Sequence, residues 1–219
     1  MDKIAFLRTT PLLAGVEEAA VVDVSQYFVE EQLRRGEEVL GKDSAAQTMY
    51  FVAEGVLKAY KISANGREQI LSLMRPGDFF DEMLLDGGPS LANVAALGVA
   101  SLYGIGKEHL HIIMERHHQI ARNLLNMLAW RIRYLVSLVE DLSFRTVVAR
   151  LAKILLDHSQ TADKTRLTQR DMAALVGSVR EVISRSLKYM EDRELIEIRR
   201  RQIILKNLDG LKELAELAT

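Results

Sequence analysis

Four polar side chains lie close together in the C-terminal third of the chain, where they could form hydrogen bonds with the edges of DNA bases. They are Arg180, Glu181, Ser184 and Arg185. Arginine can donate two hydrogen bonds to guanine O6 and N7, glutamate can accept from the cytosine amino group, and serine can contact either neighbour. In a helix these positions share one face, because residues four apart lie on successive turns. The pattern predicts a helix that reads bases in the major groove.

The elements that would position this helix are two short helices joined by a tight turn. Thr168 with Asp171 predicts a cap for the first helix, and Ser178 with Glu181 repeats that spacing for the second. Gly177 predicts the break, because glycine tolerates the left-handed backbone that ends a helix. The second helix has an apolar face that can pack inward, formed by Val179, Val182, Ile183, Leu187 and Met190. Caps and charged faces occur in any helical hairpin, so this spacing alone leaves a purely structural interpretation open.

Two short apolar runs follow the second helix, at residues 195–198 and 202–205, and a run of arginines joins them. A basic hairpin directly after the second helix predicts a winged helix whose arginines reach backbone phosphates. The predicted phosphate-binding residues are Thr168, Gln169, Arg170, Ser178, Lys188, Arg199, Arg200 and Arg201. Such contacts add affinity and salt dependence but little sequence specificity.

Composition limits the class of protein. The 219 residues have room for one large or two modest domains and carry a formal net charge of −1, whereas residues 166–206 hold 10 Lys and Arg against 6 Asp and Glu, a local excess of +4. The absence of cysteine excludes disulfides, Cys-ligated clusters and thiol switches. The N-terminus lacks a signal-peptide pattern and no run reaches membrane-spanning length, so we expect a cytoplasmic protein.

The first half of the chain predicts a β-barrel. Residues up to about 30 are mainly helical in pattern, and residues 36–106 change to short β-type runs, such as 48–52, 56–62 and 69–74. Asn65-Gly66 between two of these runs indicates a tight hairpin. Many short strands at regular spacing are typical of a sandwich or jelly roll. The fold class is therefore α+β, with the barrel preceding a long helix and the winged helix-turn-helix.

A helical period follows from about Glu108 to Leu142. We divide the chain into a sensing barrel at 1–112, a dimerisation helix at 113–142 and a DNA-binding domain at 143–219. The helix has more apolar surface than a lone barrel would cover, and its expected partner is the same helix of a second subunit. The alternative is that the helix packs only across its own barrel. The predicted seam residues are Ile120, Leu124, Met127, Leu128, Leu135, Leu138 and Leu142.

Other function classes have less support in the sequence. A cupin-like metalloenzyme would draw histidine ligands from its strands, but residues 1–108 contain no histidine. The sequence shows no nucleophile elbow and no glycine-rich phosphate loop. A regulatory module without a DNA role would leave the Arg180–Arg185 face and the wing arginines unexplained.

Barrel, long helix and winged helix, in that order, resemble the Crp/Fnr family of bacterial transcription regulators, over residues from about 20 to 207. The run Met74-Arg75-Pro76-Gly77-Asp78-Phe79-Phe80 is similar to the family's turn into a barrel strand. Arg180-Glu181 followed by Arg185 is similar to the cyclic-AMP receptor branch, and Glu181 with Ser184-Arg185 to the Fnr branch. The resemblance implies a homodimeric regulator that binds double-stranded DNA and contacts RNA polymerase. An activator role is the expectation, while whether transcription is raised or lowered stays open. We expect half-sites with a TGA core, best written TGTGA.

The resemblance also implies an effector pocket, at Phe80, Asp81, Glu82, Ala92, Asn93, Leu135 and Val136. Glu82 matches the family's ribose-binding glutamate. The family's phosphate-binding Arg-Ser pair falls on Ala92-Asn93, and its adenine-contacting Thr-Ser pair falls on Leu135-Val136. No Lys or Arg lies between Pro76 and Gly106, and a buried phosphate needs a cationic partner. We expect an effector other than cyclic AMP, while Asp81 and Glu82 can equally be strand-end carboxylates.

Three alternatives for the effector stay open: a cyclic nucleotide after all, an apolar ligand or no ligand, and haem. Haem needs an axial ligand, usually histidine. His117-His118, before the long helix, is the only histidine pair in the chain, and a solvated pair at a helix start is the simpler interpretation. We therefore predict no certain cofactor.

Overall fold

The computed structural model describes residues 2–160, 167–200 and 202–216. The chain forms two compact units. The N-terminal unit comprises Met1–Lys61 and Leu71–Arg133, and the C-terminal unit comprises Ile62–Ile70 and Tyr134–Thr219. The division falls inside a long helix, whereas the sequence prediction treats that helix as a segment of its own.

The N-terminal unit begins with short helices, as predicted. Helix α1 (Lys3–Thr9) starts at Asp2, whose carboxylate accepts from the backbone N–H of Ala5. A short 3-10 helix, η1 (Pro11–Leu13), and helix α2 (Glu18–Ser25) follow. Their apolar side chains lie in the core of the unit, among them Phe6, Leu7, Leu12, Leu13, Val21 and Val24.

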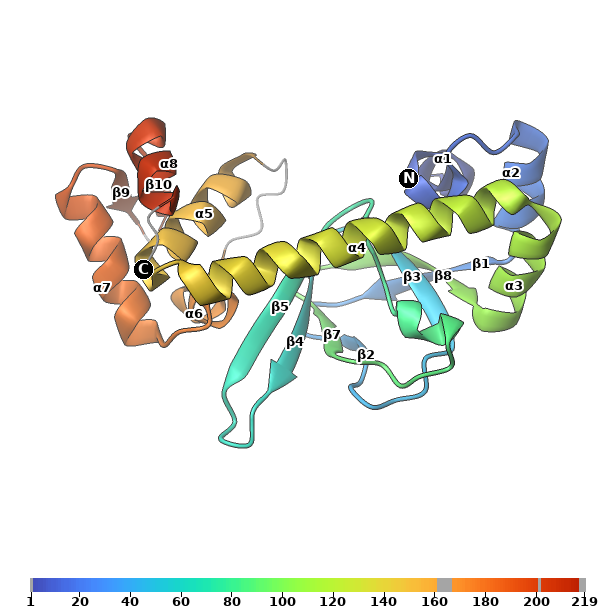
Figure 1. Cartoon of the computed structure of the whole chain (residues 1–219), viewed down its shortest axis with the longest axis horizontal. Helices are drawn as coiled ribbons and strands as arrows, with labels where there is room; N and C mark the ends of the chain where they lie inside the picture. The colour runs from blue at the N-terminus through green and yellow to red at the C-terminus, as the bar shows by residue number, and fades with distance from the viewer. Residues whose placement is uncertain (1, 161–166, 201, 217–219) are drawn as a thin grey trace. The chain divides into compact units, whose positions relative to one another are not determined.

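Two four-stranded sheets form the predicted sandwich (Figure 1). One has the order β1 (Phe28–Leu33), β8 (Ala100–Gly106), β3 (Thr48–Glu54) and β6 (Phe79–Phe80). The other has the order β2 (Glu38–Leu40), β7 (Asn93–Ala96), β4 (Leu57–Ile62) and β5 (Glu68–Met74). Both sheets contribute to the buried cluster of Leu33, Val52, Leu57, Met74, Phe80, Val94 and Leu102.

The Asn65-Gly66 hairpin is confirmed between β4 and β5. The N–H of Ser63 donates to the Arg67 carbonyl at 2.9 Å, and the Arg67 N–H donates to the Ser63 hydroxyl at 3.1 Å. Gly66 has a φ of +73°, which an L-residue rarely adopts.

The predicted helical stretch forms two helices. Helix α3 (Lys107–Arg116) ends at His117, and helix α4 (His118–Phe144) then runs without a break. Ile120, Leu124 and Met127 are buried in the core of the N-terminal unit, at 5% exposure or less. These three residues were predicted as seam residues, and that prediction is wrong, because their face of α4 already covers its own sandwich.

A second apolar face of α4 is exposed. Leu125, Ala129, Ile132, Val136 and Val139 are spaced 4, 3, 4 and 3 residues apart and are all exposed. We call these five residues the exposed stripe. Of the other predicted seam residues, Leu135 and Leu142 are exposed, and Leu128 and Leu138 are partly buried.

The C-terminal unit contains helices α5 (Val147–Gln160), α6 (Gln169–Val176) and α7 (Arg180–Asp192). Strands β9 (Ile196–Arg199) and β10 (Gln202–Leu205) pair antiparallel as the predicted wing. A further helix, α8 (Leu208–Glu216), packs on α5 and is not among the predicted elements. The core of the unit contains Ala149, Leu151, Ile183, Leu187, Met190 and Leu211.

Across the described ranges, no helix combines the length and apolar composition that crossing a bilayer requires.

Gly55, in the turn between β3 and β4, tests the packing of the sandwich. Its φ is +81°, and an added Cβ would lie 2.4 Å from the Val99 carbonyl oxygen. Gly55→Ala should lower the free energy of unfolding by about 3 kcal/mol, because it adds backbone strain to overpacking. Urea unfolding measures this. Gly98→Ala is the matched control, since a Cβ there meets no atom within 4 Å; equal effects of the two changes would contradict the prediction.

Candidate nucleic-acid interface

The start of α6 is held by a reciprocal cap, as predicted. The N–H of Asp171 donates to the Thr168 hydroxyl at 3.2 Å, and the Asp171 carboxylate accepts from the Thr168 N–H at 2.8 Å. The Thr168 hydroxyl also donates to that carboxylate at 2.7 Å. Because its polar groups are used locally, Thr168 has less capacity for a phosphate than the sequence suggests. Gly177 ends α6 with a φ of +74°, also as predicted.

The start of α7 differs from the prediction by one residue. The helix is capped at Val179, and the Ser178 side chain makes no capping hydrogen bond. The predicted Ser178–Glu181 cap is therefore wrong. The reason lies in the turn, where the Ser178 N–H closes the end of α6 by donating to the Ala173 carbonyl at 2.9 Å. Val179 also fails to pack inward and is 45% exposed.

The remaining faces of α7 match the prediction. Ile183, Leu187 and Met190 are buried against the rest of the C-terminal unit. Arg180, Glu181, Ser184 and Arg185 are all exposed on the opposite face. Within the described ranges these four side chains make no hydrogen bond or ion pair, so their donors and acceptors are available to a ligand. A cavity of about 820 Å³ adjoins this face, lined by Leu167, Thr168, Gln169, Arg170, Arg180, Ile198 and Ile203 among others.

Several charged side chains around this face already form ion pairs within the C-terminal unit. Lys188 pairs with Asp192 at 2.8 Å, and this contact raises the pKa of the lysine. Glu197 pairs with Lys206 at 3.0 Å and with Arg199, and these two partners lower the pKa of Glu197. Arg170 and Arg200 are exposed at the α6 start and the wing turn, and the predicted Arg201 lies outside the described residues.

Three of the predicted effector residues, Phe80, Asp81 and Glu82, lie together in an acidic and largely buried region. Phe80 is buried and stacks on Tyr50, with ring centroids 5.1 Å apart. Asp81 is 6% exposed and accepts from the Ser90 hydroxyl at 2.8 Å, while its other oxygen is buried without a partner in the described part of the chain. Burial raises the pKa of Asp81, and the neighbouring charge of Glu82 raises it further.

Glu82 has a partner that the sequence reasoning missed. Arg131 of α4 pairs with Glu82 at 2.7 Å and also donates to the Phe79 carbonyl at 2.7 Å. Its guanidinium lies 5.1 Å from the centre of the Phe79 ring. Arg131 lies 49 residues from Glu82 and outside the barrel strands, so proximity in the sequence does not indicate this pair. The available signal is its spacing of four from the buried Met127, which places both residues on one face of α4.

The remaining predicted effector residues are not brought together as a phosphate site. Asn93 accepts from the backbone N–H of Lys42 at 2.7 Å, and Ala92 adds no polar group. Leu135 and Val136 belong to the C-terminal unit and are exposed. A cavity of about 420 Å³ lies instead beside the 77–79 turn, lined by Pro11, Ala14, Asp78, Asn126, Met127 and Trp130 among others.

The histidine pair lies where α3 meets α4. His117 ends α3, and His118 is the first residue of α4. Among the described residues, no cluster of three or more His, Asp or Glu side chains is arranged to hold a metal ion.

Comparisons with known proteins agree with this organisation. Residues 30–117 match the cyclic nucleotide-binding domain, and residues 149–214 match the Crp-like helix-turn-helix domain. The chain is 26% identical to the CRP-like cAMP-activated global transcriptional regulator of Mycobacterium tuberculosis, covering 96% of this chain and 98% of the relative. It is 29% identical in sequence to the solved structure of FixK2 from Bradyrhizobium japonicum, with a TM-score of 0.76 over 88% of this chain and 99% of that one.

A more distant structure shares the fold alone. The c-di-GMP responsive global regulator CLP of Xanthomonas campestris is 20% identical, with a TM-score of 0.75 over 86% of this chain and 99% of that one.

Proposed function

Because this chain belongs to the Crp/Fnr family of transcription regulators, we propose that it binds DNA as a homodimer and reads a palindrome whose half-sites contain TGA. One observation carries the base-reading part of the proposal. The exposed face of α7 presents four polar side chains that no described residue engages. A major groove supplies the complementary groups at the spacing of a helix.

The chemistry of the four side chains suggests the half-site. Arg180 and Arg185 can each donate two hydrogen bonds to a guanine, Glu181 can accept from a cytosine amino group, and Ser184 can contact a neighbouring base. These pairings fit a TGTGA half-site and its complement. Phosphates on either side would bind the α6 start at Thr168, Gln169 and Arg170, the turn at Ser178, and the basic groups Lys188, Arg199, Arg200 and Arg201.

Arg180→Ala tests base reading. Its affinity for a TGTGA-N6-TCACA duplex should fall by about 1–3 kcal/mol per half-site, and discrimination at one base position should relax. Fluorescence anisotropy on matched and base-substituted duplexes measures both effects. Arg193→Ala is the control, because Arg193 follows the last turn of the same helix and lies over the Tyr189 ring. An equal loss on specific and scrambled DNA would show that Arg180 contacts only the backbone.

The exposed stripe supports the dimer. Its 4-3-4-3 spacing is that of a two-stranded coiled coil, in which residues from each helix alternate along a shared seam. Exposed apolar residues in such a row are unfavourable in water unless a partner covers them. A second copy of α4 presents the same spacing and is therefore the proposed partner. RNA polymerase is the further partner that transcription regulation would require.

Ile132→Asp tests the dimer, because Ile132 is the central residue of the stripe and is 62% exposed. The variant should sediment as a monomer and lose cooperative binding to the palindrome, since burying two carboxylates in the seam is costly. Analytical ultracentrifugation measures the mass. Val22→Asp is the control, because Val22 is a 49% exposed valine on a different helix. A dimeric Ile132→Asp protein would contradict the proposed seam.

The effector is proposed to be something other than cyclic AMP. The residues that would meet the phosphate carry no cation, and Arg131 is already engaged with Glu82 and the Phe79 carbonyl. Asp81 adds a buried carboxylate to the same region, and one of its oxygens has no partner in the part of the chain that the structure describes. A phosphate there would face like charge and would lack a strong hydrogen-bond donor.

Cyclic AMP should accordingly leave the affinity for the palindromic duplex unchanged. Isothermal titration of the protein with the nucleotide should show no saturable heat, and anisotropy with and without it should coincide. Specific DNA binding that appears only with cyclic AMP would show that Asp81, Asn93 and Arg131 rearrange to admit a phosphate.

A further inference from the structure

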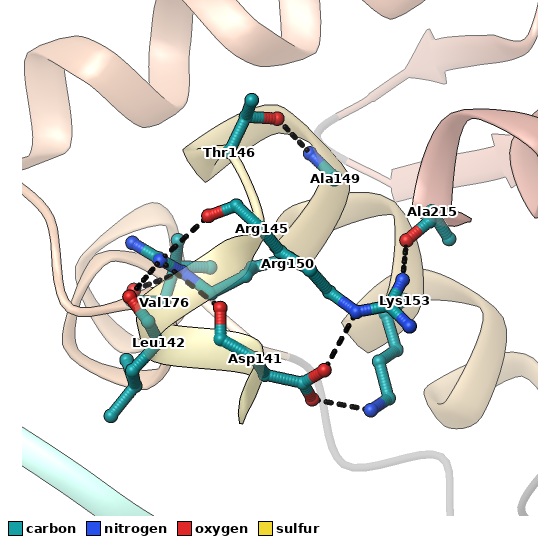
Figure 2. Close-up of polar contacts among 9 residues, drawn as sticks. All are labelled: Asp141, Leu142, Arg145, Thr146, Ala149, Arg150, Lys153, Val176 and Ala215. Carbon is teal, nitrogen blue, oxygen red and sulfur yellow. Dashed lines mark hydrogen bonds and ion pairs between the residues drawn. The ribbon is translucent and has the colours of Figure 1, made fainter. Parts of the chain in front are cut away.

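One guanidinium connects two helix ends in the C-terminal unit. Arg150, in the first turn of α5, donates through Nε to the Val176 carbonyl at 3.0 Å. Its Nη1 lies 2.9 Å from the Arg145 carbonyl oxygen, 3.3 Å from that of Leu142 and 3.4 Å from that of Asp141. Figure 2 shows these acceptors around the Arg150 guanidinium. Arg150 therefore bridges the end of α4 and the end of α6.

The geometry suits an arginine in particular. The last carbonyls of a helix have no partner within the helix and carry partial negative charge. A guanidinium offers five N–H donors in a rigid plane, and hydrogen bonds from a charged donor are stronger than neutral ones. Burial lowers the pKa of Arg150, while the charge of Asp141 opposes that shift. A lysine would keep the charge but could not address both helix ends with a fixed fork.

The neighbouring ion pairs attach α4 to other helices without reaching α6. Asp141 accepts from Arg145 at 2.7 Å and from Lys153 of α5, and Arg145 also donates to the Ala215 carbonyl of α8 (Figure 2). Thr146 starts α5 by accepting from the Ala149 N–H at 3.1 Å. These contacts join the last turn of α4 to α5 and α8. Among the side chains of this cluster, Arg150 is the one whose hydrogen bonds extend to the helix-turn-helix.

Val176 lies immediately before the turn that orients α7. Gly177 follows it in the left-handed region, and an added Cβ there would lie 3.7 Å from a methyl carbon of Leu142. The end of α4 and this turn are thus in close contact, and Arg150 supplies the directional hydrogen bonds of that contact. A change in the Arg150 contacts would alter the tilt of α6, and α7 would move with it through the short turn.

We propose that Arg150 is a positioning residue for DNA recognition, which fixes the reading helix α7 relative to the last turn of α4 and so sets the half-site spacing that the dimer accepts. The inference rests on the proposed dimeric reading of a palindrome. Adding one base pair between half-sites moves them by about 3.4 Å and rotates them by about 35°. A dimer whose reading heads are held rigidly tolerates such a change poorly, whereas loosely held heads tolerate it.

The test selects binding sites from a randomised double-stranded DNA library with the full-length protein, Arg150→Gln and Lys153→Gln. Wild-type protein should enrich paired half-sites with one dominant spacer. Arg150→Gln should enrich the same half-site with a broadened distribution of spacers. Anisotropy on the recovered sequences should show the preference over a spacer changed by one base pair falling from about tenfold or more to less than about threefold.

Lys153→Gln is the matched control, because Lys153 also ties α5 to Asp141 but has no hydrogen bond with α6. It should keep the wild-type spacer. Thermal unfolding and non-specific DNA binding monitor folding, and Arg150→Lys serves as the milder variant if Arg150→Gln unfolds. A single unchanged spacer for folded Arg150 variants would overturn the inference, as would equal broadening by Lys153→Gln. A wild-type selection without paired half-sites would instead overturn the proposed dimeric function.

Discussion

The choice of which face of α4 packs against the N-terminal core is the constraint on which the rest of the structure depends. Ile120, Leu124 and Met127 are buried in the N-terminal core, and burying side chains of this size stabilises the folded chain by several kcal/mol in sum, at about 1.5–3 kcal/mol for each. Because the helix is regular, fixing one face also fixes the others. Leu125 and Ile132 must then point away from that core. The same helix supplies its last turn, with Asp141, to the C-terminal unit.

The charge around Asp81 and Glu82 limits the ligands that this part of the sandwich can accept. A structure with this fold is described as responsive to c-di-GMP, whereas a sequence relative is named for activation by cAMP. A fold of this kind does not by itself determine a ligand. Asp81 is buried, and one of its oxygens has no partner among the described residues, while Arg131 pairs with the neighbouring Glu82. Burying a carboxylate without a full set of partners is unfavourable, and a second anion would increase the cost.

The polar groups of the C-terminal unit are of two kinds. Backbone carbonyls around the turn are satisfied by side chains of the same unit: Ala174 accepts from Gln69 at 2.6 Å, Val176 from Arg150 at 3.0 Å and Ser178 from Arg67 at 2.8 Å. The outward side chains of α7 have no such partners within the described ranges. A turn held by hydrogen bonds beside an exposed polar face suits preorganised recognition, because less ordering remains to be done on binding.

The sequence by itself determined the order of the domains and the exposed polar face of α7. Local signals were sufficient there, because each feature depends on residues close together in the chain. These features are the strand runs around Asn65-Gly66, the Thr168–Asp171 cap, the helix break at Gly177 and the arginine-rich wing. Arg180, Glu181, Ser184 and Arg185 share a face by helical geometry alone. The sequence placed the α7 cap at Ser178, whereas the helix is capped one residue later, at Val179. The difference arises because the Ser178 N–H closes the end of α6 by donating to the Ala173 carbonyl.

Only the tertiary structure decided which apolar face of α4 packs inward. The helix carries two apolar rows, and periodicity cannot tell which row a distant sandwich will cover. The partner of Glu82 lies 49 residues away on another element, and the acceptors of Arg150 lie on two helices separated in sequence. Ion pairs and hydrogen bonds of this kind depend on how elements meet in space, and residue spacing along the chain does not predict these contacts.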